Sequence, residues 1–538
     1  ALQSYSPENL SINEGMDFVL MHVYQVAPEL VKQPEDLLKF LLRRHYTNQA
    51  IPEALEDRLV GKLTKNPSLA NWPLETLLKS RKAFFEFLQE RWPIFVNTFG
   101  DVDGKSGQQH RDATSLKHDG PPHIPFDSHD VRVFMDNMFV EGLLKPVDCD
   151  NPEKPLPKWM AMGVRNSEVS HALQKLEMLL NSVAINIPDS DSTASQWQSF
   201  AYKWAELSLS VHTENIQIPE KCAERISTAQ DTMDRNFLGW LRNRYSGLNA
   251  MAPNPPVMVS HIPRYLSRRM DGNPGCKVLF ILVDGMAVEQ WLAIKRDMEI
   301  SNAGWKFDEN SVFAWAPSLT SFSRQSAFAG KAPVFFPASI SSTDREKSHW
   351  SAFWNGSGLK PDEIRFEKYT QDPKRADIES LLNEPDVRAI GVILTQVDSI
   401  MHGACLGSAG MMNQVRLWAS QSAMANIVEM ALAKGFEVYI SSDHGNVESV
   451  GIGRPSEGVE AELRGQRVRI FDNPDSRARV RRRFPDAIEW PPDGLPENCF
   501  VLFAPGNSAF VTPGERIVTH GGLSLQEMIV PFVRVGLD

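Results

Sequence analysis

Several features common in other protein classes are missing from this chain of 538 residues. It has no apolar run close to the roughly 18 residues that a membrane-spanning helix needs, so we expect no membrane association. Its 5 cysteines are odd in number and include no CxxC pair, which argues against a disulfide framework or a cysteine-based zinc site and favours a reducing cytoplasm. The formal net charge of -11 argues against a general electrostatic grip on nucleic acid, although a local basic groove stays open.

The chain also shows no signal peptide, transit segment, internal repeat or low-complexity segment. It begins with Ala1 rather than methionine, which is consistent with a missing initiator or a longer N-terminus. The composition, 42% hydrophobic and 23% charged, is that of a globular protein. A chain of this length exceeds one ordinary core, so we expect two to four domains.

Two kinds of pattern divide the sequence near residues 250–258. Before this point, apolar residues at three- and four-residue spacing predict helices over 35–46, 73–98, 166–186, 195–211 and 218–247. The stretch 100–158 is rich in Asp, Gly, Pro and His and is predicted to form loops around a short helix. We therefore expect a helical N-terminal domain at 1–100, a loop-rich and then helical middle region at 101–257, and a catalytic domain at 258–538.

After residue 258, short β-branched runs alternate with helix-length segments. The predicted strands are 277–283, 311–315, 388–395, 436–442 and 500–503. A helix-length segment between 395 and 436 ends at Gly435, in a position typical of a helix C-terminus. Strand, helix and strand in this order predict βαβ units and a mainly parallel sheet. The predicted fold class is therefore α/β, preceded by a mostly helical region.

Metal-ligating residue types follow several hydrophobic runs at the point where each run ends. They are Asp284, Asp398, His402, Asp443, His444 and His520. In an open α/β sheet, the loops that leave the carboxyl ends of parallel strands converge on one crevice. Each residue alone has an ordinary interpretation, such as a helix cap or a surface pair. Their joint occurrence predicts the two-metal site of a hydrolase, most simply one that cleaves phosphate esters.

A candidate nucleophile lies in the segment APSLTSFSRQSAFAG. Thr320 is placed at an expected loop-to-helix junction, where a metal would lower the pKa of its hydroxyl and the helix N-terminus would favour phosphate oxygens. Thr320 or Ser321 also suits a plain helix cap, and the two interpretations are compatible. Arg324, one turn further on, either forks onto a phosphate or is an ordinary exposed arginine.

An arginine-rich stretch lies nearer the C-terminus. The segment 476–484 holds five arginines, and Arg464, Arg467 and Arg469 stand shortly before it. One interpretation is a groove that follows the phosphates of a nucleic acid. A solvated amphipathic segment or a salt-bridged face is the more common structure for such a run, and this second interpretation is preferred.

The order of these site residues resembles that of the alkaline phosphatase superfamily. Within it, the sequence resembles the PglZ family, which belongs to bacterial phage-exclusion (BREX) systems, in the stretches PPVMVSHIPRYLSRR, PSLTSFSRQSAFAG, SSDHG, RGQRVRIFDN and HGGLSLQEMIVP. The resemblance covers about 258–538. It implies an alkaline-phosphatase-like α/β/α sandwich with a mainly parallel sheet.

The resemblance also implies the ions and their ligands. Two divalent cations are expected, zinc first and manganese as the alternative. Asp398, His402 and His520 match the ligands of one ion. Asp284, Asp443, His444 and the Thr320 hydroxyl match those of the other. We expect Thr320 to attack phosphorus and form a phosphothreonine that water then releases, with Arg324 as a second catalytic residue.

These inferences lead us to expect a cytoplasmic, metal-dependent phosphodiesterase or nuclease of a phage-defence complex. Its expected partners are a phosphodiester, nucleotide or nucleic-acid substrate and other BREX proteins. Two alternatives stay open. The first is a partner-binding subunit whose hydrolase site is dispensable. The second is a phosphomonoesterase or phosphomutase of small molecules, and the lack of a large inserted domain between 331 and 387 argues weakly against the mutase.

Overall fold

The structure is a computed structural model of the whole chain. It describes residues 11–24, 26–46, 51–99, 116–149, 156–164, 168–213, 218–271, 273, 275–302, 304–404, 407–458 and 465–537. The chain separates into two compact units, Ala1–Lys175 and Leu176–Asp538, and each is described by itself. No helix in the described ranges has the length and apolar content to cross a bilayer.

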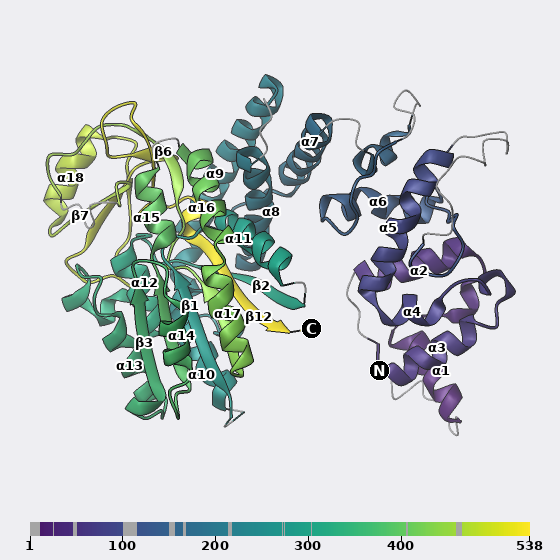
Figure 1. Cartoon of the computed structure of the whole chain (residues 1–538). Helices are drawn as coiled ribbons and strands as arrows, with labels where there is room; N and C mark the ends of the chain where they lie inside the picture. The colour runs from purple at the N-terminus through teal and green to yellow at the C-terminus, as the bar shows by residue number, and fades with distance from the viewer. Residues whose placement is uncertain are drawn as a thin grey trace. The chain divides into compact units, whose positions relative to one another are not determined.

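The first unit is built from helices, as its sequence pattern predicts. They are α1 (Ile12–His22), α2 (Pro34–Tyr46), α3 (Glu53–Leu63), α4 (Leu74–Lys79), α5 (Arg81–Thr98) and α6 (His129–Val140) (Figure 1). The single helix predicted over 73–98 is two helices, because Ser80 has an extended backbone and its hydroxyl accepts a hydrogen bond (3.1 Å) from the N–H of Ala83 at the start of α5. Trp92 of α5 is buried in the core of this unit, and its Nε1 donates to the carbonyl of Gly163 (2.7 Å).

The second unit holds a central sheet, its covering helices and two small sheets. Its helices are α7 (Glu168–Asn186, which starts in the first unit), α8 (Ala194–Thr213), α9 (Glu220–Leu248), α10 (Ile262–Asp271), α11 (Val288–Ser301), α12 (Thr320–Ala329), α13 (Glu346–Gly356), α14 (Arg375–Leu382), α15 (Gln396–Gly403), α16 (Gly407–Ser420), α17 (Ala423–Ala433), α18 (Pro474–Arg483) and α19 (Leu525–Met528). The strands of the small sheets are β6 (Val447–Gly451), β7 (Val468–Phe471), β8 (Ile488–Glu489), β9 (Phe500–Phe503), β10 (Ser508–Ala509) and β11 (Arg516–Thr519), in the orders β10-β6-β11 and β7-β9-β8.

The central sheet is mixed and mainly parallel. Its strands are β1 (Lys277–Val283), β2 (Trp305–Phe313), β3 (Ile364–Tyr369), β4 (Ala389–Leu394), β5 (Phe436–Ser441) and β12 (Ile529–Leu537), in the order β2-β12-β5-β1-β4-β3. β3, β4, β1 and β5 run parallel to one another, whereas β12 is antiparallel to both β5 and β2. The α/β prediction is confirmed, and so is the helical character of the first unit.

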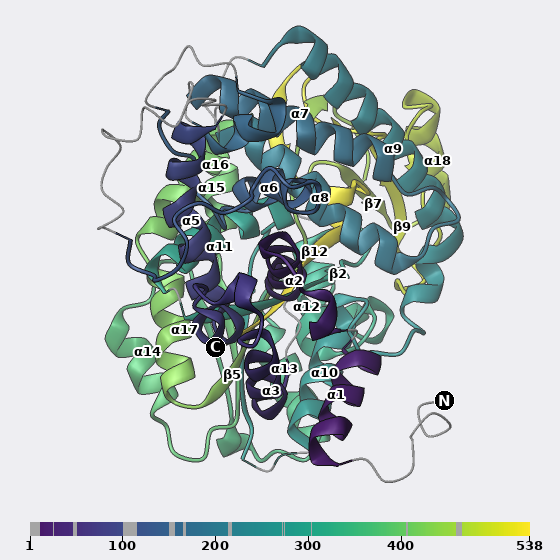
Figure 2. The same ribbon diagram turned by 90° about the vertical axis from the view of Figure 1, so that its right-hand side faces the viewer.

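Helices cover both faces of this sheet, which explains why β1 reads as one continuous apolar run. Phe280 packs with Phe328 of α12 and Trp350 of α13 on one face. Ile281 belongs to the cluster on the other face, together with buried residues of α11, α14, α16 and α17. Figure 2 shows α11, α14 and α17 on one side of the sheet and α10, α12 and α13 on the other. Burying both faces removes most of the apolar surface of β1 from water, which is the main stabilising contribution in such a fold.

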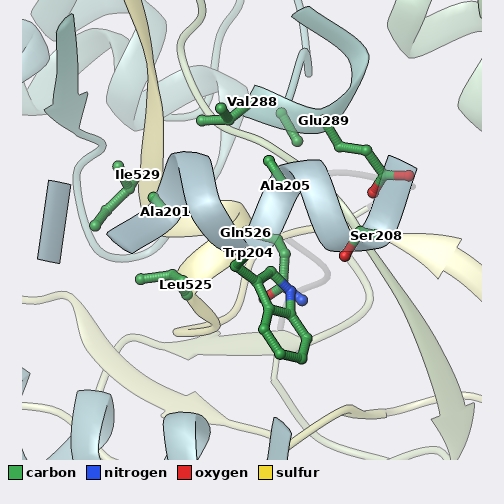
Figure 3. A pocket seen from close by; sticks show the side chains of 10 residues that line it. Ala201, Trp204, Ala205, Ser208, Val288, Glu289, Leu525, Gln526 and Ile529 are labelled. Atoms are coloured by element: carbon green, nitrogen blue, oxygen red, sulfur yellow. The ribbon is translucent and has the colours of Figure 1, made fainter. Parts of the chain in front are cut away.

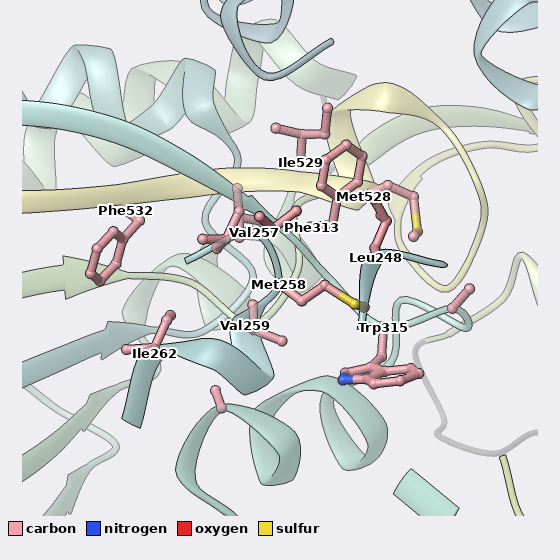
Figure 4. Close-up of a cluster of buried hydrophobic side chains, with 14 of the residues drawn as sticks. Leu248, Val257, Met258, Val259, Ile262, Phe313, Trp315, Met528, Ile529 and Phe532 are labelled. Atoms are coloured by element: carbon pink, nitrogen blue, oxygen red, sulfur yellow. The ribbon is translucent and has the colours of Figure 1, made fainter. Parts of the chain in front are cut away.

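The helices α8 and α9 share a core with the sheet. Figure 4 shows Leu248, at the end of α9, close to Met258, Phe313 and Met528. The Tyr245 hydroxyl of α9 donates to the carbonyl of Ala314 (2.9 Å). The second compact unit therefore starts at Leu176 and includes α8 and α9, because these helices bury their apolar faces in the same core as the sheet. The division into domains at 1–100, 101–257 and 258–538 stays a prediction.

Some elements differ from the sequence-based expectation. β3 and β12 were not predicted, and β2 starts at Trp305 rather than 311. The helix-length segment before Gly435 forms two helices, because Ser422 has a positive φ of 60° and separates α16 from α17. Gly435 itself ends α17 with a φ of 76°, as predicted for a helix C-terminus.

Candidate metal centre

The parallel strands end at one edge of the sheet, and there the structure brings together the residues selected from the sequence. They form two groups, Asp398, His402 and His520, and Asp284, Asp443 and His444. Within each group, one nitrogen or carboxylate oxygen from every residue lies within 4.8 Å of the others. The convergence of strand ends in an α/β sheet explains why the residues that follow β1, β4 and β5 meet. His520 is different, because it follows β11 of a small separate sheet.

The first group combines a helix and a loop. Asp398 and His402 lie one turn apart on α15, directly after β4, and His402 Nε2 donates to Asp398 Oδ1 (2.9 Å). His520 follows β11, and its Nδ1 donates to the carbonyl of Ser318 (3.0 Å). Burial raises the pKa of Asp398, but the hydrogen bond from His402 and the nearby imidazole charges outweigh it and lower the pKa to about 2. Asp398 is therefore a carboxylate at neutral pH.

The second group is more deeply buried. Asp284 follows β1, and Asp443 and His444 follow β5, with Asp443 and His444 at 0% exposure. Asp443 Oδ1 accepts hydrogen bonds from the N–H groups of Gly285 (3.0 Å) and His444 (3.0 Å). Its other oxygen, Oδ2, accepts no hydrogen bond from any residue that the structure describes. A fully buried carboxylate oxygen in this state is suited to a cation.

The hydrogen bonds of two histidines fix which ring nitrogen carries a lone pair. Nδ1 of His444 faces the carbonyl of Gly445 (2.9 Å), and Nδ1 of His520 faces the carbonyl of Ser318 (3.0 Å). A carbonyl only accepts, so Nδ1 carries a hydrogen in both rings, and Nε2 is the nitrogen that binds a metal when the ring is neutral. The two rings stack with centroids 4.0 Å apart, which joins the two groups into one centre.

Thr320 lies at this centre as the first residue of α12. Its Oγ1 is 3.0 Å from Nε2 of His444, and the side chain is 8% exposed. Leu319 precedes it with an extended backbone and offers no side-chain cap. The N-terminal end of α12 favours negative charge beside the Thr320 hydroxyl.

Charge and burial shift the pKa values of the second group in opposite directions. Burial and the charge of Asp284 raise the pKa of Asp443 well above its usual range. Burial and the charge of His520 hold the pKa of His444 well below its usual range, so this imidazole is neutral. The second group therefore combines two buried carboxyl groups with a neutral imidazole, and Arg324 is the cation that pairs with Asp284.

Arg324 is 1% exposed and its guanidinium is held by protein groups. It pairs with Asp284, donates from Nε to Glu346 Oε1 (2.7 Å) and donates from Nη2 to the carbonyl of Thr343 (3.3 Å). Burial lowers the pKa of Arg324, but the three nearby carboxylates outweigh it and raise the pKa, which keeps the group charged. Its catalytic contact with a phosphate stays a prediction, and the structure gives it a different role, that of holding Asp284 in place.

Several polar residues that the sequence did not single out position the centre. The Ser318 hydroxyl donates to the carbonyl of Gly522 (2.8 Å) and accepts from the N–H of Gly521 (3.1 Å), which fastens the loop of His520. The Ser323 hydroxyl donates to the carbonyl of Asp443 (2.5 Å). The run of hydroxyl residues around Thr320 was a usable signal for these serines. Nothing near Glu346 marks it as the partner of Arg324, because only the fold brings α13 beside α12.

Two glycines let the backbone pass through the centre. A Cβ on Gly445 would lie 1.9 Å from the carbonyl oxygen of Gln526, so only glycine fits beside His444. Gly285 has a φ of 71°, a conformation that other residues adopt rarely, and it turns the chain directly after Asp284. Gly285 after Asp284 and Gly445 after His444 are therefore part of the site's geometry.

The donor types fit divalent cations. Each group offers a mixture of carboxylate oxygen and imidazole nitrogen, and the Thr320 hydroxyl lies next to the second group. Zinc and manganese accept such mixed ligands, whereas calcium and magnesium prefer oxygen alone. The unsatisfied Oδ2 of Asp443 supports the same conclusion.

Among the residues that the structure describes, two of the five arginines in the arginine-rich stretch 476–484 have acidic partners. Most of it forms α18, where Arg477 pairs with Glu489 (3.0 Å) and Arg479 pairs with Glu457 (2.8 Å). Arg467 and Arg469 are 1% and 2% exposed, so they cannot form a surface groove. The salt-bridged interpretation therefore describes Arg477 and Arg479. Arg482 and Arg483 are exposed, and Arg464 lies outside the described residues.

A small cavity beside the centre is a separate feature. Figure 3 shows it between α8 and the segments around Val288 and Leu525, with Trp204 and Ile529 on its wall. Its lining is mostly apolar and includes none of the six candidate ligands. The cavity is therefore a packing gap next to the centre rather than the place where a substrate meets it.

A mainly parallel α/β sheet with two carboxylate-imidazole groups at its carboxyl edge defines an alkaline-phosphatase-like domain. Comparison with protein families agrees, because residues 268–535 match the family described as the BREX system PglZ alkaline phosphatase-like domain. This part of the chain is a PglZ domain.

The chain was also compared with solved structures and with curated proteins. Murine ectonucleotide pyrophosphatase/phosphodiesterase 5 is 12% identical with a TM-score of 0.36, over 48% of this chain and 87% of that chain. The human counterpart is 10% identical with a TM-score of 0.34, over 48% and 87%. Phosphonoacetate hydrolase from Sinorhizobium meliloti 1021, in complex with phosphonoformate, is 12% identical with a TM-score of 0.31, over 48% and 89%. No curated protein matches the chain.

Proposed function

We propose that this chain is a metal-dependent phosphodiesterase or nuclease-type hydrolase of a BREX phage-defence system. The observation that carries the proposal is the position of the Thr320 hydroxyl, 3.0 Å from His444 Nε2, beside two groups of metal-ligating side chains. A nucleophile, a charged centre and a helix N-terminus then act on the same phosphorus. The match to a BREX domain supports the further proposal that its partners are other proteins of that system.

The ligands divide between two divalent cations, which we propose to be zinc, with manganese as the alternative. Asp398, His402 and His520 would hold one ion, and Asp284, Asp443, His444 and the Thr320 hydroxyl would hold the other. When bound, such ions supply positive charge that stabilises the phosphoryl oxygens and lowers the pKa of a nearby hydroxyl. The deep burial of the second group keeps competing water away from its carboxylates.

The residues of the chain carry the covalent steps. Thr320 Oγ1 forms a bond to phosphorus and loses its proton, while the bond from phosphorus to the ester oxygen breaks and that oxygen leaves as an alcohol with one proton. Water then adds to the phosphothreonine, which restores the Thr320 hydroxyl and releases the phosphate product. The N-terminal end of α12 lies beside this hydroxyl and stabilises the negative charge on the phosphoryl group.

A single substitution tests the covalent step. Thr320→Ala should abolish turnover of a chromogenic phosphodiester by the zinc-loaded protein, while metal content and the unfolding midpoint stay at their wild-type values. Thr320→Ser should keep part of the rate, and Thr228→Ala, an exposed position on α9, should keep all of it. A Thr320→Ala variant that turns over at the wild-type rate would show that water attacks phosphorus directly. A wild-type protein inactive on every ester offered with zinc and manganese would reject the proposed hydrolase.

A further inference from the structure

Lys368 lies at the same sheet edge as the metal centre, although the proposed mechanism does not use it. It is the second-last residue of β3, where it aligns with Ile393 of β4, which in turn aligns with Leu282 of β1. Asp284 and Asp398 follow the ends of β1 and β4. The register of β3 against β4 and β1 therefore places Lys368 level with the strand ends that Asp284 and Asp398 follow.

A shared hydrogen-bond acceptor places the Lys368 ammonium next to the centre. Its Nζ donates to the carbonyl of Thr343 (3.2 Å), and Nη2 of Arg324 donates to the same oxygen (3.3 Å). Arg324 pairs directly with Asp284 of the second ligand group. One carbonyl and one guanidinium thus separate the Lys368 ammonium from a candidate metal ligand.

The two cations differ in what they can reach. Arg324 is 1% exposed and donates its hydrogen bonds to protein groups, whereas Lys368 is exposed. Within the described part of the chain, no carboxylate lies at ion-pair distance from Lys368, and the carbonyl of Thr343 uses one of its three N–H donors. Its ammonium therefore keeps donors for a group that arrives from solvent.

The charged groups of the metal centre act on the pKa of Lys368. Partial burial of its ammonium and the charge of Arg324 lower the pKa of Lys368, while the charges of Glu346, Asp284 and Asp443 act in the opposite direction. These carboxylates belong to the second ligand group or to its support. An anion bound at that group lies within the same range of interaction.

We propose that Lys368 is a substrate-binding residue that contacts a non-ester oxygen of the phosphoryl group presented to Thr320. This inference rests on the proposed hydrolase function and narrows its substrates. An ammonium at this position attracts a phosphoryl group with two negative charges, as in a monoester or a terminal phosphate, more strongly than the single charge of a diester. Lys368 thereby raises the relative activity on substrates with a terminal phosphate.

Steady-state kinetics on matched substrates test this role. For the zinc-loaded full chain, Lys368→Ala should lower kcat/KM on 4-nitrophenyl phosphate by about tenfold to a hundredfold, the range expected for a charged hydrogen bond. The loss on bis(4-nitrophenyl) phosphate should be several times smaller. Lys368→Arg should recover part of the monoester activity. The matched control is Lys360→Ala, an exposed lysine just before the opposite end of β3, which should leave both substrates unchanged.

A binding measurement separates this inference from the proposed hydrolase. Calorimetric titration with inorganic phosphate should show affinity in the wild-type and Lys360→Ala proteins that Lys368→Ala weakens by about tenfold or more, with zinc content unchanged. This result stands even if no ester is hydrolysed, in which case only the hydrolase proposal fails. Equal phosphate affinity in Lys368→Ala and wild type, no phosphate binding by either, or equal losses on monoester and diester would overturn the assignment of Lys368.

Discussion

The hydroxyl oxygen of Thr320 lies 3.0 Å from Nε2 of His444, although 124 positions separate the two residues in the chain. Thr320 starts α12, and His444 follows β5. The sheet brings them together, because β2, which leads to Thr320, is separated from β5 only by β12. The pair is the point at which the proposed nucleophile meets the proposed ligands.

Removing one carboxylate from each group should remove one ion at a time. Asp443→Asn and Asp398→Asn should each reduce bound zinc from about two ions per chain to about one, because each keeps the ligands of the other group. Mass-spectrometric metal analysis after loading and desalting measures the ratio. Asp308→Asn, an exposed position on β2, should keep two ions. Loss of both ions in each single variant would mean that the two groups act as one site.

Arg324 should matter for stability as well as activity. It is the cation between buried Asp284 and buried Glu346, so Arg324→Met leaves two buried carboxylates without compensation and should cost roughly 3–5 kcal/mol of unfolding free energy. Adding Glu346→Gln should recover part of this loss. Urea unfolding of the two single variants and the double variant measures the coupling. If Arg324→Met instead keeps wild-type stability and loses only activity, the role of Arg324 is the predicted phosphate contact.

Asp234 of α9 makes stability depend on pH. Burial raises the pKa of Asp234 to about 7, with smaller opposing effects from Arg467. The folded carboxyl therefore holds its proton more tightly than the unfolded one, so the folded state loses stability as pH rises from about 4 to about 7. Asp234→Asn should be neutral near pH 4 and should raise the unfolding free energy by roughly 1–4 kcal/mol at pH 8.

Unfolding curves at the two pH values check this prediction. Glu224→Gln serves as the matched control, because Glu224 is an exposed residue of the same helix. That variant should change stability little at either pH. A gain for Asp234→Asn that is the same at pH 4 and pH 8 would contradict the assigned protonation and point to a packing effect.

Gly445 should tolerate no side chain. Gly445→Ala puts a methyl group 1.9 Å from the carbonyl oxygen of Gln526, so the backbone next to His444 has to move. We expect a loss of roughly 2–4 kcal/mol in unfolding free energy and reduced zinc content. Differential scanning calorimetry and metal analysis measure the two effects. Gly356→Ala, which meets nothing within 4 Å, is the control and should leave both values unchanged.

The sequence identified the strand ends at which the site is built. β1, β4 and β5 are short, continuous apolar runs followed by acidic or imidazole residues. Such runs can be recognised in a sequence because helices cover both faces of a parallel sheet, so both sides of each strand are apolar. The pairing of Asp398 with His402 could also be predicted, because residues four positions apart share a face of α15. β12 and β3 were missed. β12 also reads as apolar, but it lies antiparallel between β2 and β5, and no βαβ pattern in the sequence indicates such a strand.

The tertiary structure decided what each charged residue contacts. From the sequence, Arg324 had equal claim to a phosphate and to open solvent, yet the packing of α13 beside α12 gives it Glu346 and Asp284 as partners. The same holds for Lys368, whose position beside the centre depends on the register of β3 against β4. The sequence by itself determined which side chains can hold ions, because ligand chemistry belongs to the residue type. Distances and burial depend on strand order and helix packing, and these arise from contacts between segments far apart in the chain.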